Sequence, residues 1–265
     1  MTTWARRRLG QHFLVDSAVV ARLVDSLALD PGRDVVVEIG PGRGALTRHL
    51  AGRCKRLVAI ELDAHLAAEL EKSFAGQDQV RIVRGDFLKT PLAQFGPGEG
   101  ERLRVVGNIP YSITSDIVLK LLEPQNRALL WDATLTVQRE VAERIVARPG
   151  SKVYGVLSVL SQVLARPQLL FTIPARAFRP QPKVGSAVVR WADLQNPPHV
   201  LADEAVFRGV VRTAFGQRRK KLLNTLKAVG PEALDRLREA GVDLSRRPEE
   251  LAPAEWVTLA NRLVE

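Results

Sequence analysis

Four consecutive residues, Asn108-Ile109-Pro110-Tyr111, combine hydrogen-bond acceptors with a stiff turn and an aromatic ring. The Asn108 side-chain oxygen and the main-chain carbonyl of Ile109 or Pro110 can each accept one N–H of an exocyclic amine such as adenine N6. Holding both N–H groups draws that nitrogen toward sp³ geometry and frees its lone pair. Pro110 fixes the turn, and Tyr111 offers a face for base stacking. The tetrapeptide predicts a site that makes an amine nucleophilic; the alternative is an ordinary strand-to-helix turn.

A glycine-rich loop with the sequence EIGPGRG occupies residues 38–44, between a predicted strand and a helix. Gly40 and Gly42 let the backbone lie close to a ligand, and the helix N-terminus adds exposed N–H groups. Glu61, at the end of the next predicted strand, is placed to accept both ribose hydroxyls of a nucleoside. Glu38 suits a cationic amino group and would be a poor neighbour for a pyrophosphate. The loop therefore favours S-adenosylmethionine as the cofactor.

The same loop also fits a second class of enzyme. Gly40, Gly42 and Ala45 satisfy the G-x-G-x-x-G/A dinucleotide fingerprint, and Glu61 lies at the spacing that this fingerprint requires. A NAD-dependent enzyme therefore stays open on the loop alone. Asp86, which follows Gly85 at the end of the third strand, can accept the N6 amine of a donor adenine, although an aspartate there is also a common cap.

The elements that must position these residues alternate between strand and helix from residue 34 to about 147. Predicted strands cover 35–39, 57–60, 80–83, 103–106 and 133–137, and predicted helices cover 44–51, 63–74 and 115–122. This alternation is typical of a doubly wound, Rossmann-like α/β sheet. Asp16 is expected to cap a preceding amphipathic helix. A helix over 153–165 and strands over 169–173 and 187–191 are expected to follow.

The end of the chain is predicted to be purely helical. Residues 195–198, Gln-Asn-Pro-Pro, read as a linker. Beyond them, helices are predicted near 203–215, 217–228, 231–240 and 253–264. We therefore expect a large α/β domain over residues 1–194 and a small all-helical domain over 199–265.

The charge balance points to a polyanionic partner. The net charge is +10, and eight basic residues without one acidic residue lie between positions 144 and 190. Such an excess favours nucleic acid, with a solvated basic face as the alternative. Cys54 is the single cysteine, so no internal disulfide forms, and the sequence shows no signal peptide or membrane span. We expect a cytoplasmic monomer that needs no metal.

Together these motifs resemble the rRNA adenine N6-dimethyltransferases, and specifically the KsgA branch that acts on the small ribosomal subunit. The resemblance covers nearly the whole chain. It implies a class I methyltransferase domain over residues 1–194 and a helical RNA-recognition domain over 199–265. Besides the loop, Glu61, Gly85-Asp86 and Asn108 to Tyr111, it is carried by GQHFL at 10–14, QREVAERI at 138–145, FRPQPKV at 178–184 and FGQRRK at 215–220.

The resemblance implies a donor site lined by His12, Leu14, Gly40, Glu61, Asp86 and Asn108. It implies that Tyr111 and Phe178 sandwich the target adenine, within rRNA of an assembling small subunit. Two positions depart from the family pattern: Gly185 stands where an aspartate is usual, and Ile109 replaces the commoner leucine. Because Ile109 also occurs in the Erm branch, which acts on the large subunit, that branch stays open. So does a noncatalytic ribosome-assembly factor with the same fold.

Overall fold

The computed structural model describes residues 12–264, and the chain forms two compact units. The first, the sheet unit, comprises Met1–Ala142 and Gln168–Gln195. The second, the helical unit, comprises Glu143–Pro167 and Asn196–Glu265. The junction at 195/196 falls in the predicted linker, whereas the helical unit also takes in residues 143–167 from the middle of the chain.

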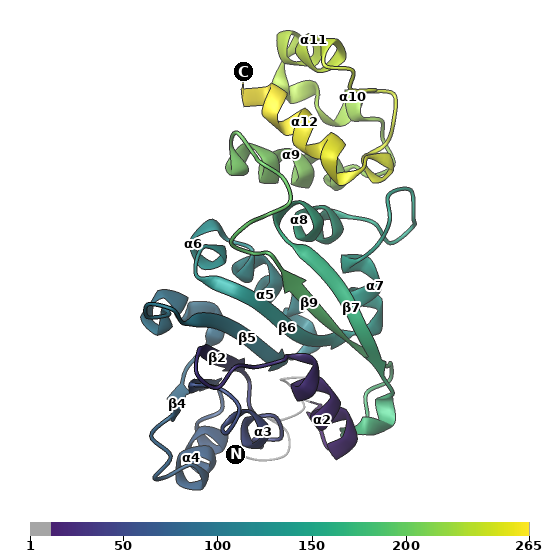
Figure 1. Ribbon diagram of the computed structural model, residues 1–265. Helices are drawn as coiled ribbons and strands as arrows, with labels where there is room; N and C mark the ends of the chain where they lie inside the picture. The colour runs from purple at the N-terminus through teal and green to yellow at the C-terminus, as the bar shows by residue number, and fades with distance from the viewer. Residues whose placement is uncertain (1–11, 265) are drawn as a thin grey trace. The chain divides into compact units, whose positions relative to one another are not determined.

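The sheet unit is built on seven strands in the order β4-β3-β2-β5-β6-β9-β7 (Figure 1). Neighbouring strands are parallel from β4 to β6, and β9 is antiparallel to β6. The predicted Rossmann-like α/β sheet is confirmed. The bounds are β2 (Asp34–Ile39), β3 (Arg56–Glu61), β4 (Val80–Arg84), β5 (Arg102–Asn108), β6 (Leu130–Gln138), β7 (Arg166–Ile173) and β9 (Ser186–Ala192).

Side-chain caps set the start of two predicted helices. Asp16 accepts from the backbone N–H groups of Ala18 and Val19 at the start of α2 (Ser17–Ser26). Asp63 does the same for α4 (Ala64–Ser73), as its sequence position predicts. The remaining elements around the sheet are α3 (Thr47–Leu50), α5 (Thr114–Leu121), α6 (Pro124–Arg127), α7 (Arg139–Ile145), η1 (Phe87–Lys89), η2 (Leu92–Phe95), η3 (Tyr111–Ile113) and η4 (Ala175–Ala177).

Helix α3 is shorter than predicted. It begins at Thr47 rather than at Gly44 because Gly44 has φ +77°, in the left-handed region that helices do not continue through.

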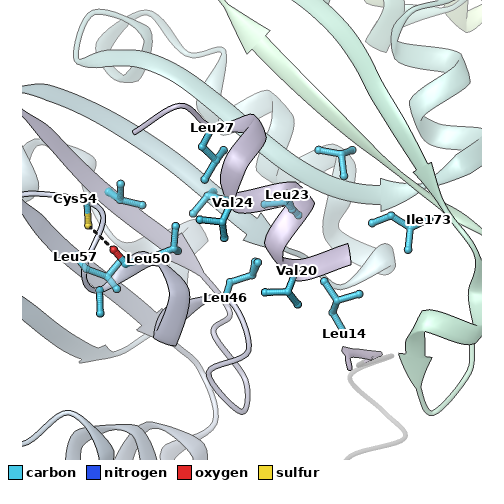
Figure 2. Packing of buried hydrophobic residues seen from close by; sticks show 14 of the residues in the cluster. Leu14, Val20, Leu23, Val24, Leu27, Leu46, Leu50, Cys54, Leu57 and Ile173 are labelled. Atoms are coloured by element: carbon cyan, nitrogen blue, oxygen red, sulfur yellow. Dashed lines mark hydrogen bonds between the residues drawn. The ribbon is translucent and has the colours of Figure 1, made fainter. Parts of the chain in front are cut away.

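A hydrophobic cluster ties α2 to the sheet. The cluster contains Leu23 and Val24 of α2, Leu50 of α3 and Leu57 of β3, all of them buried (Figure 2). Cys54 lies in the same cluster, where its Sγ donates to the Leu50 carbonyl at 3.3 Å. In this buried position Cys54 serves as a small apolar side chain of the core.

A two-stranded sheet brings the start of the chain to a late segment. Strand β1 (Phe13–Leu14) pairs antiparallel with β8 (Phe178–Arg179), with Leu14 opposite Phe178. This pairing anchors the segment that precedes helix α2.

The helical unit has its own aromatic core. Tyr154 lies 6.3 Å from Phe215, and Phe215 stacks on Trp256 at 5.6 Å, so residues near 154 pack with the C-terminal helices. The elements are α8 (Val156–Leu164), α9 (Glu204–Gly216), α10 (Leu222–Thr225), η5 (Lys227–Val229), α11 (Pro231–Glu239), η6 (Pro248–Glu250) and α12 (Pro253–Val264). The helix predicted over 217–228 is therefore two short pieces. Over residues 12–264, no helix combines the length and apolarity needed to cross a membrane.

Candidate active site

A cavity of about 810 Å³ opens at the carboxyl ends of the parallel strands. Gly40 follows β2, Leu62 follows β3, Gly85 follows β4, and Asn108 ends β5; all four line the cavity. Parallel strands end at one edge of a sheet, so four segments far apart in sequence meet there. Ten of the eleven predicted site residues line this cavity: His12, Leu14, Glu38, Gly40, Gly42, Glu61, Asp86, Asn108, Pro110 and Tyr111.

The glycine loop has a backbone that only glycine adopts easily. Gly40 and Gly42 have φ of +60° and +58°, in the left-handed region. A Cβ on Gly42 would lie 2.8 Å from Cε1 of Phe13, whereas a Cβ on Gly40 would meet no atom within 4 Å. Gly42 is thus required by the packing of Phe13, and the bare side of Gly40 leaves room for a ligand.

Glu61 fastens the loop to the end of β3. Its Oε2 accepts the N–H of Gly42 at 2.9 Å and its Oε1 accepts the N–H of Asp63 at 2.8 Å, while the residue is only 2% exposed. Burial raises the pKa of Glu61, and the two N–H donors oppose that rise. Each carboxylate oxygen can accept a further hydrogen bond, so Glu61 remains able to receive hydroxyl groups.

Glu38 is a buried carboxyl with an unsatisfied oxygen. It is 1% exposed, and its Oε2 has no hydrogen-bond partner among residues 12–264. Burial raises its pKa to about 8, and the charge of Glu61 adds to the rise. A buried carboxyl is strongly stabilised by a cation beside it, so the site fits a positively charged ligand group.

Asp86 caps the short helix η1 and also lines the cavity. Its Oδ1 accepts the N–H of Leu88 at 2.9 Å. Both interpretations of this aspartate from the sequence, a cap and a ligand contact, are compatible with this position. Phe87, the next residue, is buried and forms part of the cavity wall.

The Asn108 amide is oriented by the start of the chain. Its Nδ2 donates to the main-chain carbonyl of His12 at 2.8 Å. A carbonyl only accepts, so the amide nitrogen must face His12 and Oδ1 remains available as an acceptor.

Two contacts hold the Tyr111 ring, one through its hydroxyl group and one through its aromatic face. Its hydroxyl is 2.6 Å from Oγ of the buried Ser186, and burial raises its pKa. The His12 ring stacks on the Tyr111 ring with centroids 5.4 Å apart, and His12 Nδ1 lies 2.7 Å from the Pro180 carbonyl oxygen. The aromatic ring predicted to stack on a base is therefore fixed in place.

The structure does not bring Phe178 to the cavity. Its side chain is fully buried in the hydrophobic cluster around α2. Side chains alternate between the faces of a strand, so the next residue of β8, Arg179, lines the cavity together with Pro180. The sandwich of Tyr111 and Phe178 that the resemblance implies is absent from this arrangement.

Sequence reasoning missed several wall residues. Phe13 lies under the Arg43 guanidinium, with Arg43 Cζ 5.1 Å from the ring centroid, and both line the cavity. A side chain at Gly42 would clash with Phe13. This contact between the two residues can be recognised only once the fold is known. Gly10 and Gln11 of the N-terminal motif lie outside the described residues.

Comparisons with known proteins show what the whole chain resembles. The family model described as "Ribosomal RNA adenine dimethylase" matches residues 3–265. A curated relative from Acinetobacter baylyi, "Ribosomal RNA small subunit methyltransferase A", is 44% identical over 98% of this chain and 93% of its own length. The solved structure of the 23S rRNA methyltransferase ErmE is 30% identical with a TM-score of 0.72, covering 96% of this chain and 100% of that one. A dimethyladenosine transferase from Plasmodium falciparum has a TM-score of 0.79 at 24% identity, covering 94% and 96%.

Proposed function

The chain belongs to the ribosomal RNA adenine dimethylase family, and on that premise we propose that it methylates N6 of adjacent adenosines near the 3′ end of small-subunit rRNA, using S-adenosylmethionine. The observation that carries the proposal is the orientation of Asn108. Its amide nitrogen is occupied by the His12 carbonyl, so its oxygen is available at the cavity for an incoming amine.

The donor side of the cavity fits S-adenosylmethionine. When bound, this cofactor supplies an electrophilic methyl group. Glu61 would accept the ribose hydroxyls, and the unpartnered oxygen of Glu38 would face a cationic group. Asp86 would accept the N6 amine of the donor adenine, and the bare side of Gly40 gives the ligand room.

The acceptor side consists of the Asn108–Tyr111 turn. Asn108 Oδ1 and a main-chain carbonyl of the turn hold the two N–H groups of the target amine, which leaves its lone pair exposed. Positive charge develops on that nitrogen during transfer, and the two fixed oxygens stabilise it without reorganising. The N-methylated cation loses its proton to water, so no side chain has to act as a base.

The RNA is proposed to contact the basic stretch between positions 144 and 190 and the basic run at 218–221, with the C-terminal helices (199–265) recognising the shape and backbone of folded rRNA. The target adenines would be unstacked and held against Tyr111. An assembling small subunit is the proposed substrate, and a cytoplasmic monomer remains our expectation. The small-subunit target is supported by the name of the Acinetobacter relative at 44% identity, compared with 30% for ErmE.

An Erm-type enzyme acting on large-subunit RNA is the second candidate, favoured by Ile109 and by the ErmE match over the whole of that chain. The test offers undermethylated small subunits, large subunits and deproteinised large-subunit RNA to the purified protein with tritiated donor. We expect label in small-subunit RNA near its 3′ end. Label only in large-subunit RNA would support the Erm candidate. Label in neither, with donor binding intact, would support a noncatalytic assembly factor.

A further inference from the structure

Lys120 makes an unusual set of contacts beside the cavity. Its Nζ lies 2.7 Å from the carbonyl oxygen of Phe87, 3.0 Å from that of Leu88 and 2.7 Å from that of Thr90. An ammonium group has three N–H donors and no acceptor. All three donors of Lys120 are therefore used on one segment of four residues, and the same group lies 5.0 Å from the Phe87 ring centroid.

That segment forms the cavity wall next to Asp86. Helix η1 is a single 3₁₀ turn over Phe87–Lys89, capped by the Asp86 side chain, and Asp86, Phe87 and Leu88 all line the cavity. Within this turn the Phe87 carbonyl accepts the Thr90 N–H at 3.2 Å, but so short a turn cannot satisfy its last carbonyls fully. Lys120 donates to three carbonyls of the segment and places a positive charge where their dipoles converge.

Lys120 also belongs to the element that follows the acceptor turn. It lies near the end of α5, and α5 begins directly after η3, which carries Tyr111. Helix α5 therefore connects the acceptor turn, at its N-terminus, with the segment that follows Asp86, which Lys120 contacts near its C-terminus. The side chain is half-buried, so its contacts are partly shielded from water.

We propose that Lys120 is a positioning residue that fixes Asp86 for recognition of the N6 amine of the donor adenine. The proposal rests on the proposed function, because it takes the ligand to be S-adenosylmethionine and its product. Lys120 acts on the ligand only through the main chain of residues 87–90. Its loss should therefore impair the distinction between an adenine and a base without the amine, more than it impairs binding of the rest of the ligand.

The test compares S-adenosylhomocysteine with S-inosylhomocysteine, which lacks the N6 amine, by calorimetry on the full chain. For the parent we expect a preference for the adenosyl ligand of about 10-fold, as one hydrogen bond to a charged acceptor gives. Lys120→Met should reduce this preference to less than about 2-fold, mainly by weakening the adenosyl ligand. Lys89→Met removes an exposed lysine from the same turn and should keep the full preference.

Each other outcome overturns the proposal in a distinguishable way. An unchanged preference in Lys120→Met, or equal weakening of both ligands, would reject the role of Lys120 while leaving the proposed function intact. A parent that binds neither ligand would reject the proposed function as well. If Lys120→Met does not fold, Lys120→Arg takes its place; arginine keeps the charge but cannot direct three donors from one atom, so a partly lost preference is expected and a full preference overturns the proposal.

Discussion

Asn108 and His12 are 96 residues apart in the sequence, and the side-chain amide of the first donates to the main-chain carbonyl of the second at 2.8 Å. This contact selects one of the two orientations of the Asn108 amide, the one with its oxygen available to an amine. It also explains why the N-terminal segment belongs to the site. His12 supplies a carbonyl that orients the acceptor, and a ring that stacks on Tyr111.

Replacing Asn108 by alanine should leave a folded protein that still binds S-adenosylmethionine and RNA. Turnover should fall by about 10²–10³-fold, because one of two fixed acceptors for the developing charge is lost. Single-turnover methyl transfer measures this directly, with donor affinity measured in parallel. Asn108→Asp serves as a second variant. It keeps an acceptor oxygen but sets a carboxylate against the His12 carbonyl, so we expect it to be impaired too. Activity near that of the parent in both variants would contradict the proposed role.

Glu61→Ala should weaken donor binding by about 1–3 kcal/mol, through loss of a charged acceptor. Glu61→Gln should bind the donor no better than Glu61→Ala, although glutamine is nearly isosteric with glutamate. Both oxygens of Glu61 accept main-chain N–H groups, from Gly42 and Asp63, so the NH₂ of a glutamine must point at a donor. Titration calorimetry on the two variants checks this. Parent-like affinity in Glu61→Gln would show that a neutral acceptor suffices.

The buried carboxyl of Glu38 should make stability depend on pH. Burial raises its pKa from 4.5 to about 8. Between these values the folded protein keeps a proton that the unfolded chain has lost, so the free energy of unfolding falls as pH rises, by about 1.4 kcal/mol per pH unit for one proton.

Glu38→Gln stays neutral and should lack this slope, with a gain of about 1–3 kcal/mol over the unliganded parent near pH 7.5. Urea unfolding at several pH values measures the effect. Glu99→Gln, at an exposed carboxylate, is the control and should keep the slope of the parent. Equal slopes in the parent and Glu38→Gln would mean that Glu38 is ionised in the folded protein.

A second buried network lies at the opposite edge of the sheet. Arg104 of β5 pairs with Asp34 at 2.9 Å and with Asp132 at 2.6 Å, and all three are buried. Arg104→Met should lower the free energy of unfolding by about 3–5 kcal/mol, because it leaves two buried carboxylates without this partner. Arg53→Met breaks an exposed pair with Asp25 and should cost less than about 1 kcal/mol.

Donor affinity should not change in folded Arg104→Met, since Asp34 begins β2 whereas the glycine loop follows its end. Chemical denaturation and calorimetry test the two halves of the prediction. Similar losses in Arg104→Met and Arg53→Met would show that the buried network contributes no more than a surface pair.

The sequence predicted the parts of the fold that depend on local patterns. A β-branched run marked β2 and a short apolar run marked β3, while Asp16 and Asp63 marked helix starts by their capping chemistry. Parallel strands bring their following residues to one edge, so the meeting of Gly40, Asp86 and Asn108 also followed from the sequence.

The sequence could not show which face a short strand presents or which distant segment packs on it. Phe178 lies in a motif that the resemblance places at the target base, yet two residues of β8 contain no pattern that separates the core face from the cavity face. Lys120 gave no signal for a related reason. Its three acceptors are main-chain carbonyls, and any residue type provides those.

The basic run at residues 218–221, after α9, contains one residue with a structural role and three with exposed side chains. Arg218 donates to the main-chain carbonyls of Lys152 at 2.6 Å and Ser151 at 3.1 Å, and lies 3.7 Å from Glu249. Arg219, Lys220 and Lys221 are exposed. If these three contact phosphates, replacing them together by alanine should flatten the dependence of log K on log salt by about 2–3, the contribution of three released counterions.

Arg218→Ala should act differently, because its donors hold the 151–152 segment within the helical unit. It should leave the salt slope nearly unchanged and lower the free energy of unfolding by about 1–3 kcal/mol through the unpaired carbonyls. Fluorescence anisotropy on small-subunit RNA over a range of salt, with thermal unfolding alongside, separates the two effects. An unchanged slope in the triple variant would assign these cations to a solvated surface. A slope flattened by about one in Arg218→Ala would instead mean that Arg218 leaves its carbonyls to contact a phosphate when RNA binds.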